Sequence, residues 1–504
     1  MHIQFRNQMT RLGVLSIAAM LVVACGRSDG PDAPGAAPPG ADGAAVPVTT
    51  NSDEARAHYE AGQELFDELK FTEAHAAFVQ AVDADPDFAM GHSMVATTAL
   101  SAAEFFDEVA KAEALKDQVS EGERLIIEAQ AAGAQNDQAT QLAKLKALVK
   151  AYPKDERTHS RLGIFLFGQQ DFTEAAKHFG HSTQINPDFA PAYNMLGYAN
   201  RQLGKLDEAK AAFERYIELI PDEPNPHDSY AELLMETGDY DGAIEHYRMA
   251  LEKDEYFGSA YAGASTAHAL KGDIDDALVA AEQMLAAART FNERQAALLQ
   301  TTRVHLVAGN LDAAMAAAKK RLAEAEVKGD HAVIGDIHEY MGDMTLDAGD
   351  GAGAETHYDA ALEHRLLADI NDANKAAARR AHVFKTAICA MVDGKNELAT
   401  ERTAEYVAAA SEHGTAFEKR RIHELQGFLA MLNEDTAGTA EHLAQASQTN
   451  PVVLFWAAMA HRDLGNLERA KELADQAANR NTLSNLLPLV RSEAQDLLDE
   501  LAAA

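Results

Sequence analysis

The side chains best suited to chemistry in this sequence are its histidines, of which there are 20. Imidazole nitrogens bind transition metals, and two histidines three residues apart share one face of a helix. His178 and His181 have this spacing, but no acidic residue and no third histidine stands in obvious register with them. Unligated surface histidines explain the pair better, so we predict no metal site.

Catalytic motifs are missing from the sequence. It has no glycine-rich phosphate loop, no nucleophile elbow and no zinc-binding set of cysteines. Neighbouring acidic residues are frequent in a chain with 79 Asp and Glu, so they give no signal for acid–base catalysis. We therefore predict that the protein is not an enzyme and uses no cofactor.

One of the two cysteines ends an apolar run near the amino terminus. Residues 12–23 are apolar except for one serine and follow Arg6 and Arg11, which is typical of a signal peptide and too short for a comfortable transmembrane helix. The run ends Val-Val-Ala-Cys25 and resembles the lipobox of bacterial lipoproteins, in which the cysteine is acylated after cleavage before it. The resemblance implies a signal peptide at 1–24 and lipidation at Cys25. Because Gly26 follows, it also implies an outer-membrane location, facing the periplasm or displayed on the surface. An ordinary secretory signal with a chance cysteine is the alternative.

Residues 25–52 are rich in Pro, Gly and Ala and show no apolar periodicity. This composition predicts a disordered linker behind the anchor. As a coil it would span on the order of 30 Å, enough to hold a folded part off a membrane. The other cysteine, Cys389, lies in an apolar helical stretch, and we expect it to be buried and inert.

The chain after about residue 53 is predicted to be helical, because Ala, Leu, Glu, Lys and Gln dominate it and Pro is sparse. Glycines recur there at intervals of 34, 34, 37, 40, 45 and 71 residues, the last being about two units. A left-handed glycine closes one helix, and the Asp or Asn that follows most of them caps the next. The intervals therefore predict a repeated helical hairpin. The glycines are Gly204, Gly238, Gly272, Gly309, Gly349, Gly394 and Gly465.

With this period the sequence resembles the tetratricopeptide-repeat family. The family pattern has a small residue in the first helix of each hairpin, then Ala, an aromatic residue, another Ala and Pro. Two of the units that fit it carry Gly163, Ala175, Phe179 and Pro187, and Gly197, Ala209, Phe213 and Pro221. The resemblance implies an all-α, right-handed superhelical solenoid of about eleven antiparallel hairpins. We expect partly degenerate repeats over 53–155, with one weak unit in 88–155, a well-formed array over 156–290, and divergent repeats with a C-terminal helix over 291–504.

The family binds partners along the concave surface formed by the first helices. The resemblance implies that groove residues stand one after, three before and four after the small residue of each unit. These are Phe167, Asn194, Tyr198, Arg201, Asp228, Glu232, Arg303, Glu339, Asp343, Phe428 and Arg462. One branch of the family grips a C-terminal carboxylate with Lys and Asn on three successive repeats. The acids Asp228 and Glu232 would repel a carboxylate, so we do not expect that clamp here.

The formal charge of −35 narrows the choice of partner. It disfavours nucleic acid and bare anionic membrane, so we expect membrane contact only through the lipid. It allows a basic partner, although acidic residues also simply keep exported proteins soluble. The function we expect is an exported, tethered scaffold that binds a protein or peptide in its groove. The alternative is a solute-binding lipoprotein that holds a small ligand inside the superhelix.

Overall fold

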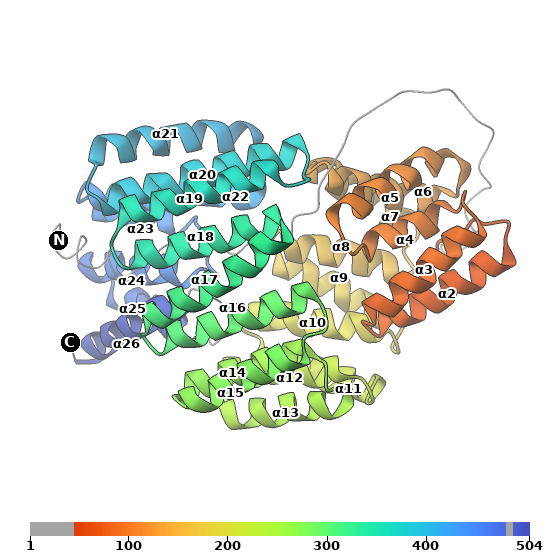
Figure 1. Cartoon of the computed structure of the whole chain (residues 1–504), viewed down its shortest axis with the longest axis horizontal. Coiled ribbons are helices and arrows are strands. Elements are labelled where there is room, and N and C mark those ends of the chain that lie inside the picture. Colours follow the sequence, from red (N-terminus) through yellow and green to blue (C-terminus); the bar gives the residue numbers. More distant parts are fainter. Residues whose placement is uncertain (1–44, 480–486, 504) are drawn as a thin grey trace. The chain divides into compact units, whose positions relative to one another are not determined.

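The computed structural model describes residues 45–479 and 487–503, so Cys25 and most of the expected linker lie outside the described residues. This part of the chain contains 25 α-helices and no strand, which confirms an all-α helical repeat solenoid (Figure 1). Among the residues described, no helix is both long enough and apolar enough to cross a membrane.

The helices form two compact units. The N-terminal unit comprises residues 45–233 and Asp369–Asn374, and the C-terminal unit comprises Leu234–Ala368 and the described residues from Lys375 on. The N-terminal unit holds α2 (Asp53–Asp67), α3 (Phe71–Ala84), α4 (Ala89–Thr97), α5 (Ala102–Leu115), the short 3-10 helix Lys116–Gln118, α6 (Glu121–Ala134), α7 (Gln138–Ala151), α8 (Glu156–Gly168), α9 (Phe172–Ile185), α10 (Ala190–Gln202), α11 (Leu206–Leu219) and most of α12 (Pro224–Glu236).

The C-terminal unit continues the alternation of first and second helices. Its elements are α13 (Tyr240–Lys253), α14 (Gly258–Lys271), α15 (Ile274–Ala287), α16 (Phe291–Val307), α17 (Leu311–Lys328), α18 (His331–Asp347), α19 (Gly351–Leu367), α20 (Asp372–Val392), α21 (Asn396–His413), α22 (Ala416–Leu432), α23 (Thr436–Leu443), α24 (Pro451–Asp463), α25 (Leu467–Asn479) and α26 (Leu487–Ala503).

The helix ends are made as the glycine spacing predicts. All seven glycines have positive φ, between 68° and 98°, in the turn between two helices. The following residue caps the next helix at Asp239, Asn310 and Asp350, where the side chain accepts a backbone N–H three residues on. Asp273 occupies the same position before α15 but makes no side-chain capping bond.

The period also extends backwards without glycine. Asn136 and Gln170 have φ of 54° and 64° and precede Gly204 by two periods and one period of 34 residues. Asn takes the left-handed conformation more readily than most residues, so these turns close in the same way. The region 88–155, read from the sequence as one weak unit, holds the helices of two hairpins, α4–α5 and α6–α7.

Small residues of the first helices let the two helices of a hairpin meet. A Cβ added to Gly163 or Gly197 would lie 2.6 Å from the ring of Phe179 or Phe213. Both rings are fully buried, as the family pattern requires. Helices α16 to α19 have 17 or 18 residues, against 13 or 14 in α8 to α15, and this extra turn per helix explains the longer glycine intervals.

Cys389 lies in the core of the C-terminal unit. Its side chain is fully buried in the main apolar cluster of that unit, with Phe384, Phe428 and Trp456 among the other members. Burial raises the pKa of the thiol far above its usual range. This confirms the predicted burial of the cysteine.

Candidate functional site

The inner face of each unit is the surface formed by the first helices of its hairpins. In the N-terminal unit these include α2, α4, α6 and α8. Residues 45–50 lie against them without regular secondary structure, and we call these residues the docked segment. The sequence favours this geometry, because a residue before Pro is pushed out of the helical region and Val and Thr are β-branched. This end of the expected disordered linker is therefore ordered against the helices.

Two carboxylates bind the docked segment through its main chain. Val46 donates its N–H to Asp155 Oδ2 at 2.7 Å, and Thr49 donates its N–H and its hydroxyl to the two oxygens of Glu123 at 2.6 Å. Glu123 is fully buried and Asp155 is 4% exposed. Buried carboxylates are stable only when donors surround them. The segment adds its donors to those of the helix starts, where the Ser120 N–H donates to Glu123 at 2.9 Å and the Arg157 N–H donates to Asp155 at 2.8 Å.

Helix α2 supplies a hydrogen-bond donor to the carbonyl groups of the docked segment. Both terminal nitrogens of Arg56 donate to the Val48 carbonyl at 3.2 Å, and one also donates to the Thr50 carbonyl at 3.3 Å. Val46 and Val48 pack on the apolar core of the unit. Acids that accept N–H groups and an arginine that donates to carbonyls together form a clamp for main-chain groups.

A cavity of about 180 Å³ opens beside the docked segment. Its walls include Tyr59, Gln63, Met90, Arg157 and Arg161. Burial raises the pKa of Tyr59 to about 12 and lowers the pKa of Arg161, while Arg157 pairs with Asp67, Nη1 to Oδ1 at 2.8 Å. The cavity thus combines an aromatic ring, a thioether and two cations.

Five predicted groove residues meet on α10 and α12. The guanidinium of Arg201 lies 4.8 Å from the centre of the Tyr198 ring. Three hydrogen bonds between residues 31 apart in sequence join the two helices: Asn194 to Asn225 at 3.4 Å, Tyr198 to Ser229 at 3.1 Å and Arg201 to Glu232 at 2.8 Å. The register predicted from the family therefore brings these side chains onto one face.

The two acidic residues of α12, Asp228 and Glu232, contribute less negative charge than the sequence indicates, because one is buried and the other is paired with an arginine. Asp228 is 5% exposed, and burial, with a smaller contribution from Glu232, raises the pKa of its carboxyl well above the usual range. Glu232 is neutralised by Arg201. The sequence showed both acids but could not show their burial.

In the C-terminal unit, Glu339 and Asp343 of α18 share a cation that the sequence did not single out. Lys385 of α20 lies 2.5 Å from Asp343 and 3.7 Å from Glu339, and Arg365 of α19 also pairs with Glu339. Burial raises the pKa of Asp343 to about 7, with Lys385 opposing the change. Lys385 was missed because the longer repeats obscure its register.

The other predicted groove residues serve packing or local ion pairs. Phe428 is fully buried in the core and cannot contact a partner, which corrects its assignment. Phe167 is half-buried and meets Phe172 edge to face at 5.1 Å. Arg303 is half-buried, and burial lowers its pKa. Arg462 pairs with Asp463 at 2.8 Å and with Glu500 at 3.3 Å.

The histidine pair noted in the sequence has a third member, His159. Its Nδ1 lies 3.1 Å from Nδ1 of His178, and its ring centre lies 5.4 Å from that of His181. His159 and His178 are 19 residues apart and lie on the two helices of one hairpin. This separation is the feature by which the sequence could have indicated their contact. The same offset recurs in two further Nδ1–Nδ1 contacts, His338–His357 at 3.3 Å and His423–His442 at 3.5 Å.

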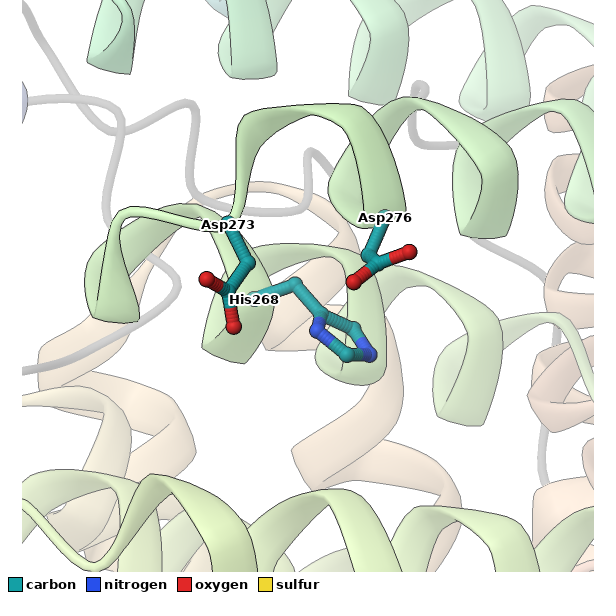
Figure 2. A group of neighbouring side chains, drawn as sticks. All are labelled: His268, Asp273 and Asp276. Atoms are coloured by element: carbon teal, nitrogen blue, oxygen red, sulfur yellow. The ribbon is translucent and has the colours of Figure 1, made fainter.

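A separate group of possible metal ligands lies at the turn between α14 and α15. Figure 2 shows His268 with Asp273 and Asp276, and one ligand atom from each lies within 4.8 Å of the others. Imidazole and carboxylate ligands suit Zn²⁺. However, Asp276 is exposed, and Asp273 also pairs with Lys271 at 3.4 Å. The sequence gave no sign of this group beyond the turn spacing that repeats along the chain.

Comparison with known families identifies the repeat. Models of the tetratricopeptide repeat match residues 190–223 and 230–293, which cover α10, α11 and the helices from α13 to α15. The chain therefore contains tetratricopeptide repeats. Their positions coincide with the stretch in which the glycine interval is 34 residues.

Similar proteins share only short stretches of this chain. Hsp70-Hsp90 organizing protein 1 of Glycine max is 33% identical over 92 residues, 18% of this chain and 16% of that protein. Protein O-mannosyl-transferase Tmtc1 of Drosophila melanogaster is 32% identical over 105 residues, 20% of this chain and 12% of that protein. The matches thus span less than a fifth of the curated relatives.

Solved structures of repeat proteins are also similar. A crystal structure of MamA has a TM-score of 0.29 and 23% identity, covering 32% of this chain and 93% of that one. A tetratricopeptide repeat protein from Parabacteroides merdae has a TM-score of 0.36 and 12% identity, covering 58% of this chain and 98% of that one.

Proposed function

We propose that the protein is an exported, membrane-tethered scaffold that holds a protein or peptide partner on the inner face of its repeats and performs no catalysis. Tetratricopeptide repeats support this, because stacked helical hairpins create long binding surfaces. The relative with a chaperone-organizing name supports a role in protein interaction, within the 92 residues that it shares.

The docked segment is the single observation that carries the proposal. Residues 45–50 lie on the inner face, held by Glu123, Asp155 and Arg56 through main-chain groups. A surface that binds a stretch of its own chain has the chemistry to bind one from another protein. Main-chain recognition gives affinity, and the apolar contacts of alternate side chains give selectivity.

The small-ligand alternative has less support. The cavity beside the docked segment measures about 180 Å³. Pockets that enclose drug-sized ligands usually measure about 300–1,000 Å³. The cavity suits one side chain of a bound peptide better than a whole metabolite.

The proposal of membrane tethering is based on the lipobox-like sequence at Cys25. The proposal of an outer-membrane location is based on Gly26. In cells fed a labelled fatty acid, the wild-type chain should become labelled and fractionate with the envelope. Cys25→Ser should lose the label and appear in the soluble fraction. An unlabelled wild-type chain would refute the anchor while leaving the scaffold proposal intact.

The scaffold proposal is tested by photo-crosslinking from two matched positions. Ile164 of α8 is 52% exposed at a groove position of the family register, and Val279 of the second helix α15 is 50% exposed. A crosslinking amino acid at Ile164 should give one defined protein adduct in cells, and the same residue at Val279 should not. Equal adducts at both positions, or none at Ile164, would contradict binding on the inner face. If the partner is basic, the adduct should weaken at high salt.

A further inference from the structure

We propose that the docked segment is a built-in competitor for the N-terminal groove, and that the partner segment which replaces it is non-helical, rich in aliphatic side chains and without acidic residues at the positions of Val46 and Thr49. By the N-terminal groove we mean the clamp of Glu123, Asp155 and Arg56 with the adjoining cavity. The inference rests on the proposed scaffold function and specifies both the ligand and its regulation.

The clamp binds mainly main-chain groups of the docked segment, so segments of other sequence can bind to it. Of the hydrogen bonds that the segment makes to Glu123, Asp155 and Arg56, only that of the Thr49 hydroxyl uses a side chain of the segment. Main-chain N–H and C=O groups are present in every sequence, apart from the N–H that Pro lacks. A foreign segment can therefore form the same bonds.

Side-chain chemistry is restricted at two positions. Val46 and Val48 pack on the apolar core, and a Cβ added to Gly122 would lie 2.7 Å from Val46 Cγ1. Small or branched aliphatic side chains fit there. The cavity, lined by Ala45 to Val48 on the segment side, leaves room for one longer aliphatic or aromatic side chain. The chain's own segment leaves this space unused, so a partner can gain apolar contact that the competitor lacks.

Charge decides what the groove rejects. Thr49 lies 2.6 Å from Glu123, and Val46 lies 2.7 Å from Asp155. An acidic side chain at either position would stand beside a buried carboxylate, and like charges at this range repel strongly. The groove therefore selects against acidic side chains at these two positions.

Covalent attachment gives the docked segment its advantage. It is joined to α2 at Ser52, the N-cap of that helix, so its local concentration at the clamp is on the order of millimolar. A free peptide of the same sequence must compete with that concentration. The docked segment should thus suppress weak ligands and yield to partners that also fill the cavity.

The experiment uses the full chain and a fluorescent, end-capped peptide copying residues 44–51. The double variant V46D/T49D should expel its own segment, and V46A/T49N is the uncharged control, with a small aliphatic side chain at position 46. The peptide should bind V46D/T49D at least tenfold more tightly than it binds the wild type or V46A/T49N, as measured by anisotropy. Adding Glu123→Gln to V46D/T49D should weaken the peptide about tenfold, while Gln preserves the helix cap.

Hydrogen exchange at residues 46–50 reports release of the segment independently of peptide binding. Equal peptide affinity for V46D/T49D and the wild type would overturn the proposal. So would persistent protection of residues 46–50 in V46D/T49D, because the groove would then tolerate acids. If Ile164 gives adducts but the peptide does not bind, the proposal that the docked segment is a competitor is refuted and the scaffold proposal stands. If Ile164 gives no adducts, the scaffold proposal is refuted.

Discussion

The paired histidines show how one residue type acquires a role through its neighbour. His159 directs Nε2 at the carbonyl of Pro153, 3.2 Å away, and Nδ1 at Nδ1 of His178. Two nitrogens at 3.1 Å form a hydrogen bond only when one of them carries a proton. Protonating both rings would place two positive charges in contact, so the pair belongs to the neutral state.

This pairing predicts loss of stability in acid. Burial, and next the charge of His159, lower the pKa of His178 to about 4 from 6.5. Between these values the unfolded chain binds more protons than the folded chain, so stability falls as pH falls from about 6.5 towards 4. Because the ring is half-buried and partly screened, we expect about 1–2 kcal/mol for this residue.

The change in melting temperature between pH 7.5 and pH 4.5 measures the effect. It should be smaller in His178→Gln than in the wild type. His413→Gln provides the control, because His413 is exposed and pairs with Glu412. An unchanged pH dependence in His178→Gln would show that the contact with His159 does not restrain protonation.

At the scale of elements, the sequence predicted what depends on local chemistry. Left-handed glycines mark the turns from Gly204 onward, and these were read correctly. The same turn is made by Leu69, Asn136, Gln170 and Glu434 elsewhere, and no composition rule reveals a left-handed leucine or glutamine. The packed helices impose that conformation, so the hairpins in 88–155 were undercounted.

The docked segment could not be read from the sequence at all. Its composition favours disorder, and its partners Glu123 and Asp155 lie 74 and 109 residues away from the donors. On α10 and α12, where the interval is 34 residues, the register brings the predicted residues into contact with one another, and their role in binding stays a prediction. The register failed at Phe428, where the units are longer and the same offset points into the core.

At the scale of the whole molecule, a stack of hairpins has no single core. Each hairpin buries its apolar face against its neighbours, so the stability of the chain is a sum of local interfaces. The two compact units, divided at Leu233 and Leu234, carry separate apolar clusters. A disturbance in one repeat should therefore remain local.

Gly163 and Gly180 test this locality, because both lie in one hairpin of the N-terminal unit. A Cβ at Gly163 would lie 2.6 Å from the Phe179 ring, so Gly163→Ala should destabilise the hairpin by about 1–3 kcal/mol. Gly180 lies within α9 with no atom within 4 Å of the added Cβ, so Gly180→Ala should stabilise it by about 0.5–1 kcal/mol. Hydrogen exchange with peptide resolution should show faster exchange in Gly163→Ala over α8, α9 and adjoining helices, with α18 and α19 unchanged. Uniformly faster exchange in both units would mean that the array unfolds as one cooperative body.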